Sequence, residues 1–208
     1  MNQTRIISSI HKFSALILGT FILAHLLNHV VAIGGISAHT HMMNRLRTVY
    51  RHPVGESILM LSICLQIATG LLKIRESGWR QSRLFDRLQV WSGAYLLLFL
   101  LAHTSAIWNA RLALELETDF YFGAVVWLKS PYVYFFALYY LLGIMAFFTH
   151  IACLFRWMFM NKIERTTLNQ IAWSLIGLGG LIWILILLTF TGLLYPISLP
   201  EMYHSYLP

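Results

Sequence analysis

The chain has 208 residues, of which 58% are hydrophobic and only 11% are charged. That composition excludes an ordinary soluble domain, in which charged residues make up about a quarter of the chain. The net charge of +7 lies in short segments between apolar stretches, so no soluble basic domain is present to bind nucleic acid.

Five apolar stretches are long enough to cross a bilayer as helices, which takes roughly 20 residues each. We expect these spans at about 7–33, 54–74, 88–110, 132–158 and 168–195. Because the connections between them are short, residues 1–208 are expected to form one transmembrane domain in contact with the lipid bilayer.

The charged residues between the spans predict the orientation. Ten lysines and arginines lie on the side of the N-terminus, and five lie on the other side. Basic residues gather on the cytoplasmic side of membrane proteins. The N-terminus is therefore expected in the cytoplasm and the C-terminus outside, in a bacterial inner membrane. A mitochondrial inner membrane protein would show the same pattern.

The first and third spans carry a repeated phrase. Residues 21–25 read Phe-Ile-Leu-Ala-His and residues 99–103 read Phe-Leu-Leu-Ala-His. The repeat predicts an all-α membrane protein with a four-helix bundle, built from two repeated helix pairs, and a fifth helix outside it. His25 and His103 then lie at the same depth, where an ionisable side chain is costly and usually marks function. The pair predicts the two axial ligands of a haem iron. The alternative is two buried histidines bonded to backbone carbonyls or to each other.

Further candidate residues lie towards the outer end of this pair. His29 follows His25 by one helical turn, so it is a second candidate for the ligand on the first helix, a partner for a haem propionate, or an interfacial residue. Arg47, Arg51 and His52 are candidates for holding propionates, because arginine pairs well with carboxylates. Ordinary loop charge is the alternative for these three residues.

Two longer connections are expected on the outer side, at residues 34–53 and 111–131, and both are predicted to be loops. The second is rich in aromatic residues and is predicted to lie along the membrane interface. Pro53 suits the first turn of a helix, so the second span is expected to begin there.

The second and fourth spans carry no matching pair of histidines. His150 lies late in the fourth span, and Gln66 lies at the comparable depth of the second. A neutral amide is a poor ligand for haem iron, so one haem is expected, and a second haem near His150 is the alternative. His11 is expected on a neighbouring helix rather than across the bundle from His150. A structural His150, bonded to Gln66 or to a backbone carbonyl, is the competing interpretation.

These features resemble the cytochrome b membrane subunit of succinate dehydrogenases and fumarate reductases, in its single-chain, five-helix form. In that family, histidines on the first four helices hold two haems, and the outer haem uses helices that correspond to those of His25 and His103. This sequence keeps His150 but has Gln66 where the resemblance implies the remaining ligand. The resemblance covers nearly the whole chain and implies non-covalently bound haem b.

The resemblance also implies a function. The chain is expected to carry electrons between a quinone pool and flavoprotein and iron–sulfur subunits on the cytoplasmic side, as the membrane subunit of a quinone-linked oxidoreductase. Some family members use an acidic residue near the outer haem, and Glu56 matches that place as a quinol proton acceptor. A carboxylate favoured by the helix N-terminus is its alternative role. The alternative function is a non-catalytic structural or assembly subunit of a respiratory membrane complex.

Overall fold

The computed structural model describes residues 2–204 and contains helices, turns and loops over that range. The elements, in chain order, are α1 (Asn2–Val31), η1 (Ala32–Gly34), α2 (Ile36–Tyr50), α3 (Pro53–Ser77), α4 (Leu84–Leu112), α5 (Phe120–Leu128), α6 (Tyr132–Phe159), α7 (Arg165–Phe190) and η2 (Glu201–Tyr203). The labels η1 and η2 denote single 3₁₀ turns.

Five of these helices, α1, α3, α4, α6 and α7, are long and apolar enough to cross a membrane. Their number and positions agree with the five spans expected from the sequence. Large apolar side chains stand exposed along them, including Leu16 at 68%, Leu98 at 63% and Phe135 at 64% exposure. Such a surface is compatible with contact to lipid, whereas soluble monomers rarely expose contiguous apolar surface of this extent.

The last helix ends earlier than expected, at Phe190 rather than near residue 195. Gly192 follows with a φ of 76°, a left-handed conformation that glycine adopts at little cost and that commonly ends a helix. The chain then leaves the helix axis, and Pro196 lies within an extended segment.

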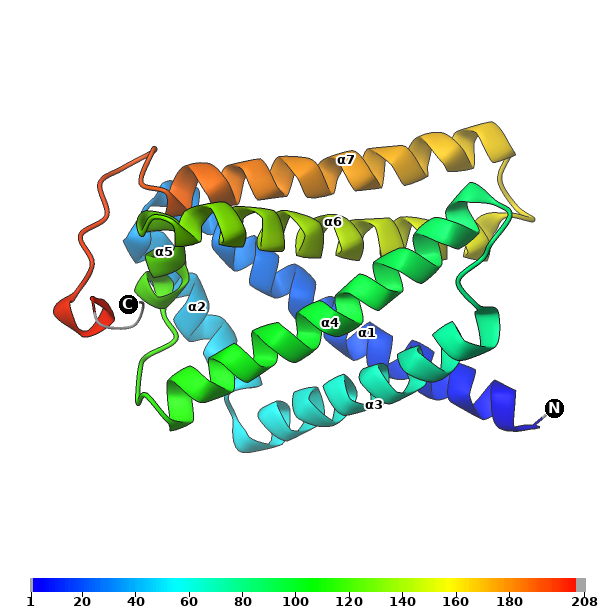
Figure 1. Ribbon diagram of the computed structural model, residues 1–208, viewed down its shortest axis with the longest axis horizontal. Coiled ribbons are helices and arrows are strands. Elements are labelled where there is room, and N and C mark those ends of the chain that lie inside the picture. Colours follow the sequence, from blue (N-terminus) through cyan, green and yellow to red (C-terminus); the bar gives the residue numbers. More distant parts are fainter. Residues whose placement is uncertain (1, 205–208) are drawn as a thin grey trace.

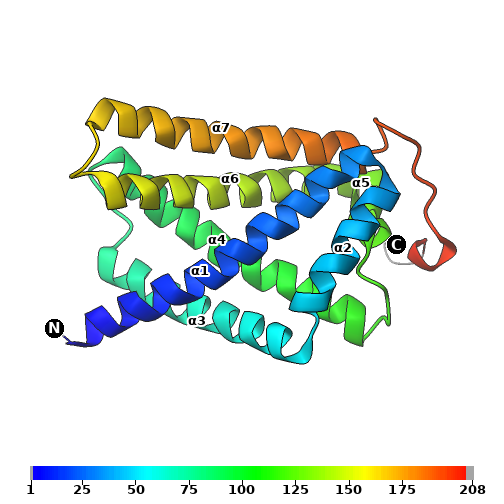
Figure 2. The ribbon, with the colours of Figure 1, turned by 180° about the vertical axis from the view of Figure 1, so that it is seen from behind.

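The five long helices form a closed ring of neighbours. Going round it, α1 packs on α3, α3 on α4, α4 on α6, α6 on α7, and α7 returns to α1. Within residues 2–204, α1 and α4 make no close backbone contact, and they cross on opposite faces of the bundle (Figures 1 and 2). The two helices that carry the repeated phrase therefore face each other across the interior.

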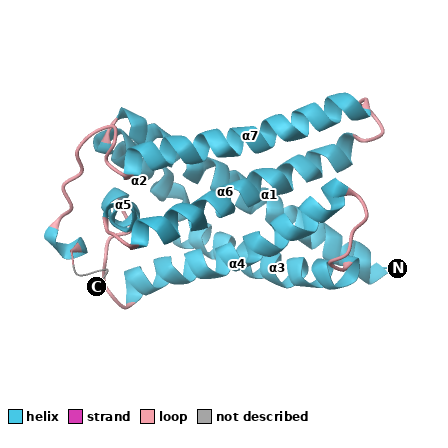
Figure 3. Ribbon diagram, turned by 45° about the horizontal axis from the view of Figure 1, so that its top comes forward, coloured by secondary structure: helices cyan, strands magenta, loops and turns pink. Residues whose placement is uncertain are grey.

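One end of the bundle is closed by short elements. Helices α2 and α5 lie there together with the C-terminal segment, at the opposite end from the N-terminus (Figure 1). We call this the capped end and the other the N-terminal end. The connections that lack helix gather at the two ends of the long helices (Figure 3).

The expectation of a loop at residues 34–53 is wrong, because residues 36–50 form α2. Gly35 makes the turn into this helix with a φ of 105°, and between it and Pro53 no glycine or proline interrupts the segment. His39 and Met43 are buried beneath α2. The segment is thus an amphipathic lid over the end of α1.

The expectation of a loop at residues 111–131 is wrong for residues 120–128, which form the buried helix α5. Phe120, Val125 and Trp127 of this helix are at most 5% exposed, and α5 packs against α6 and α7. Asp119 begins the helix by accepting hydrogen bonds from the backbone N–H groups of Tyr121 and Phe122, at 2.9 and 3.1 Å. Because α5 is apolar on all sides, it is inserted into the capped end rather than laid on its surface.

Candidate functional site

A cavity of about 290 Å³ lies inside the bundle towards the capped end. Its lining is mostly apolar and includes Leu18, Ile22, Leu96, Phe99, Ile107, Ile144 and Phe147. The polar side chains that face it include His25, His29, His103, Arg51, Glu56 and Arg111. A cavity of this size, with few polar groups in an apolar wall, has the general character of a cofactor or ligand site.

His25 of α1 and His103 of α4 meet in this cavity. Their ring centroids are 6.3 Å apart, with an angle of 61° between the rings. Bonds from a transition metal to imidazole nitrogen are about 2 Å long, so two imidazoles on opposite sides of one iron have ring centres roughly 6 Å apart. The observed separation fits a pair of axial ligands.

The repeated phrase supplies a second matched feature. Phe21 stacks on His25 at 5.7 Å and 18°, and Phe99 stacks on His103 at 5.3 Å and 12°. In each copy the phenylalanine that opens the phrase lies one turn before the histidine that closes it, so the two side chains share a helix face. Sequence reasoning singled out the histidines and missed the phenylalanines, although the same repeat marks both.

The His103 ring is held without hydrogen bonds. Within residues 2–204 its close partners are other rings: Phe99, His25 and Tyr140. Gly143 of α6 makes room for this stack, because a Cβ atom at that position would lie only 2.5 Å from the Phe99 ring. The nitrogens of His103 therefore stay available to a ligand in the cavity.

His29 lies beside His25 rather than opposite His103. The Nε2 atoms of His25 and His29 are 3.1 Å apart, which is a hydrogen bond in which one ring donates and the other accepts. His29 also stacks on His39 of α2, at 5.5 Å and 24°. Of the two candidates on α1, His25 is thus the one that pairs with His103, and His29 is its neighbour.

The proposed propionate ligands separate into two groups. Arg51 lines the cavity and donates a hydrogen bond to the Thr118 hydroxyl at 2.5 Å. Arg47 donates to the Thr118 backbone carbonyl at 3.1 Å, and both arginines pair with Glu117, at 3.6 Å from Arg47 and 3.7 Å from Arg51. His52 caps α3 by accepting from the Val54 N–H at 3.3 Å. Neither Arg47 nor His52 is part of the cavity wall.

Arg111 is the cationic residue that sequence reasoning missed. It lines the cavity near Arg51 and lies over the Trp108 ring, with its guanidinium carbon 4.9 Å from the ring centre. It also forms an ion pair with Glu56. Its place at the end of the α4 span, one turn before the charged loop, was the signal available in the sequence.

Glu56 lies in the first turn of α3 and faces the same cavity. Its carboxylate and the Arg111 guanidinium are each 25% exposed, so the pair is partly screened from solvent. The carboxylate oxygens can accept a hydrogen bond from a hydroxyl group of a molecule in the cavity.

Buried polar side chains also pack at the capped end, next to the cavity. His39 is 2% exposed and accepts from the Asn28 side-chain amide at 2.9 Å, or donates to it in the other tautomer. Burial lowers the pKa of His39 to about 4, with the Arg47 charge acting in the same direction and the Asp119 carboxylate opposing both. Tyr203 donates to Asp119 at 2.8 Å, and burial with this bond raises the pKa of its hydroxyl. The His39 imidazole and the Tyr203 hydroxyl are therefore neutral near pH 7.

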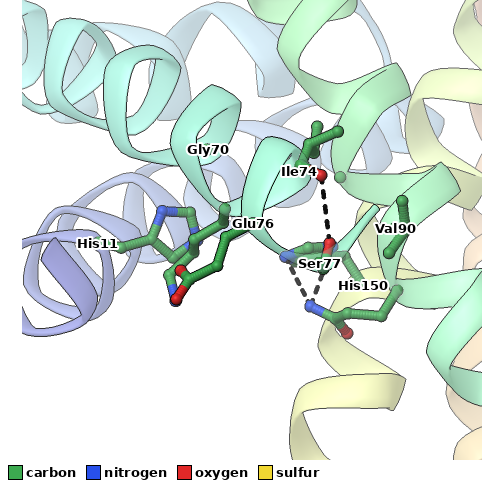
Figure 4. A pocket seen from close by; sticks show the side chains of 10 residues that line it. His11, Gly70, Ile74, Glu76, Ser77, Val90 and His150 are labelled. Atoms are coloured by element: carbon green, nitrogen blue, oxygen red, sulfur yellow. Dashed lines mark hydrogen bonds between the residues drawn. The ribbon is translucent and has the colours of Figure 1, made fainter. Parts of the chain in front are cut away.

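A second pocket, of about 320 Å³, lies at the N-terminal end. His11 and His150 line it from opposite sides, with Glu76 and Ser77 of α3 between them in the view of Figure 4. Thr69 donates its hydroxyl proton to the Leu65 carbonyl, so it accepts from Nδ1 of His11 at 2.9 Å. His11 therefore presents an unprotonated Nε2. The expectation that it lies on a helix neighbouring that of His150, rather than across the bundle, is wrong, because within residues 2–204 α1 and α6 make no close backbone contact and the two histidines line one pocket.

His150 is bonded within the second pocket to residues of α4. Gln89 donates to its Nε2 at 3.0 Å, and the Ser92 hydroxyl lies 3.2 Å from its Nδ1. Gln66 does not contact it and instead donates to the His11 backbone carbonyl at 3.2 Å. The proposed bond between His150 and Gln66 is thus wrong. Gly93 packs against the His150 ring, 3.1 Å from where its Cβ would lie.

No family model, curated protein or solved structure matches the chain. Within residues 2–204, no group of three or more His, Cys, Asp or Glu side chains converges to hold a bare metal ion. Two facing imidazoles suit a metal that brings most of its ligands with it, as a porphyrin iron does. The residues around the cavity therefore fit a haem better than a free cation.

Proposed function

We propose that this chain is a haem b-containing membrane subunit that carries electrons between a quinone pool and a partner protein. The observation that supports it most is the pairing of His25 and His103 at 6.3 Å across an apolar cavity. A haem held there would supply one-electron exchange. The proposal follows the resemblance to the membrane subunit of succinate dehydrogenases and fumarate reductases.

In this proposal the chain's own residues divide the work. His25 and His103 hold the iron, and Phe21 and Phe99 fix the orientation of the two imidazoles by stacking. Arg51, which lines the cavity, would hold the carboxylates of the porphyrin, and Arg111 in the same lining would support it. Arg47 orders the loop that follows α4 by binding Thr118 and Glu117, so it acts on the site only through that loop.

Glu56 is the proposed proton acceptor for a quinol in the same cavity. Its carboxylate would take one proton when a quinol hydroxyl replaced Arg111 as its hydrogen-bond partner. One electron would go towards the haem held by the two histidines for each proton released, and a second such step would complete the oxidation of the quinol. Because Glu56 and His103 line one cavity, both steps can occur on one bound quinol.

The orientation and partners belong to the same proposal. The N-terminal end carries most of the lysines and arginines, which supports a cytoplasmic location for that end in a bacterial inner membrane. Flavoprotein and iron–sulfur subunits would then bind there. A second haem between His11 and His150 would require Gln89 to release Nε2 of His150, so one haem per chain is the expected stoichiometry.

The test is a reduced-minus-oxidised visible spectrum of the detergent-purified chain with a haem count. We expect one b-type haem per chain, lost in His25→Ala and in His103→Ala and kept in His150→Ala. His41→Ala, an exposed histidine of α2, is the matched control. A folded chain that binds no haem would refute the redox function and favour a structural subunit of a respiratory complex. Loss of half the haem in His150→Ala would show a second site.

A further inference from the structure

A column of polar side chains starts at His25 and runs through His29 and His39 to Asn28. His29 is hydrogen-bonded to His25 at 3.1 Å, and His39 stacks on His29. Asn28 holds the other end of the column through its 2.9 Å bond to His39. Asn28 and His39 are at most 4% exposed, so the column is a built and enclosed part of the protein.

The protons in this column can be assigned. A neutral imidazole carries one N–H and one lone pair, and an imidazole that binds a metal through one nitrogen keeps the N–H on the other. Because Nε2 of His25 is bonded to His29, Nδ1 would be the nitrogen left for iron. Nε2–H of His25 would then donate to Nε2 of His29, and the His29 proton would lie on Nδ1, which is buried and has no hydrogen-bond partner within residues 2–204.

We infer that His29 is a positioning residue for His25, which fixes the ring's tautomer and raises its basicity, and that it is not itself a ligand. This inference rests on the proposed haem function. An acceptor on the free N–H of a ligand histidine is the usual device for orienting that ligand and tuning the metal. A more basic imidazole stabilises the oxidised iron, so His29 lowers the midpoint potential of the site.

The packing around His29 argues against a movable side chain that exchanges with His25. Its ring is stacked on His39 on one side and stands at 76° to Phe190, with centroids 5.2 Å apart. The His25 ring meets it at 4.4 Å and 78°. Three rings from α1, α2 and α7 therefore hold His29 in the position from which it reaches Nε2 of His25.

The test compares the midpoint potential and the low-spin EPR signal of the wild-type chain with those of His29→Leu and His29→Gln. We expect His29→Leu to keep its haem and to change the ratio of reduced to oxidised iron at a fixed potential about tenfold, which is a rise of about 59 mV for a one-electron couple. His29→Gln retains an acceptor oxygen and should stay near the wild-type potential. His41→Leu is the control for removing a histidine near the same end.

Each outcome decides one question. An unchanged potential and EPR signal in folded His29→Leu would overturn the inference while leaving the haem function intact. Loss of haem in folded His29→Leu, with haem kept in His25→Ala, would make His29 the ligand and would also overturn it. No haem in the wild-type chain would refute the proposed function itself. If His29→Leu does not accumulate, His29→Asn replaces it, since its amide is too short to reach His25.

Discussion

Gly143 offers the most direct test of how the histidine pair is held. A methyl group at this position would lie 2.5 Å from Cε2 and 2.7 Å from Cδ2 of Phe99, well inside van der Waals contact. The Phe99 ring cannot easily retreat, because it is stacked between His103, at 5.3 Å, and Tyr139, at 4.7 Å. Gly143→Ala is therefore expected to displace Phe99 and, through it, the His103 imidazole.

The size of the effect follows from a matched pair of glycines. Gly143 and Gly177 both lie inside long helices, where replacing glycine by alanine favours the helix by about 1 kcal/mol. A methyl group at Gly177 meets no atom within 4 Å, so Gly177→Ala keeps that gain. Overpacking at Gly143 costs about 1–3 kcal/mol. The two variants should therefore differ in unfolding free energy by about 1–3 kcal/mol.

The assay has two readouts on the purified chain. Unfolding in mixed detergent micelles, followed by circular dichroism, gives the difference in stability between Gly143→Ala and Gly177→Ala. The visible spectrum gives the haem content, which should fall in Gly143→Ala alone if the Phe99 stack positions His103. Equal stability and equal haem content in the two variants would refute the conclusion that Phe99 packs tightly against Gly143 and positions His103.

Two further predictions concern groups at the capped end. Glu56→Gln should leave the haem content unchanged and slow the reduction of the haem by a quinol about 100-fold or more, because the amide cannot accept a proton. Rapid-mixing absorbance measures this rate, and Glu115→Gln, at an exposed position, is the control. An unaltered rate in Glu56→Gln would exclude Glu56 as the proton acceptor. His39 has a pKa of about 4 in the folded chain, against about 6.5 unfolded. Between pH 6.5 and pH 4 the His39 imidazole takes up a proton in the unfolded chain but not in the folded one. The free energy of unfolding is therefore highest above pH 6.5 and should fall by up to about 3 kcal/mol as the pH is lowered to 4. Unfolding measured at pH 7.5 and pH 5 should show this decline in the wild type and a smaller one in His39→Gln, and equal declines would contradict it.

Hydropathy predicted the membrane spans, and the internal repeat predicted which residues lie at matching positions along them. A long apolar stretch has to span a bilayer as a helix, because backbone groups find no other partners there. The repeat placed His25 and His103 at matching positions, and the helices that carry them do cross, with the two rings 6.3 Å apart. The four-residue spacing within the repeat also places Phe21 and Phe99 on the same helix faces as these histidines. The stacking of the rings became visible only in the structure.

The depth of a residue in its span could not predict how each helix is rotated about its axis, and therefore which neighbour a side chain faces. The competing interpretation that His150 bonds to Gln66 rested on their comparable depths, yet the Gln66 amide donates to α1 and the His150 ring is bonded to α4. The fold of α2 was missed for a related reason. Its buried face is recognisable only once η1 and Gly35 have turned it back over α1.

The two ends of the bundle differ in which histidine nitrogens already have hydrogen-bond partners. Under the proposed function, this difference supports one haem per chain rather than two. At the N-terminal end, Nε2 of His150 already accepts from Gln89, so a ligand must replace that bond to bind there. At the capped end, His103 has only ring partners within residues 2–204 and faces the cavity, while Nε2 of His25 is bonded to His29, so a metal bound through Nδ1 of His25 would leave that bond intact. Leaving a buried donor such as the Gln89 amide without its partner costs about 1–3 kcal/mol. Under the proposed function, the iron would therefore bind more favourably between His25 and His103 than near His150.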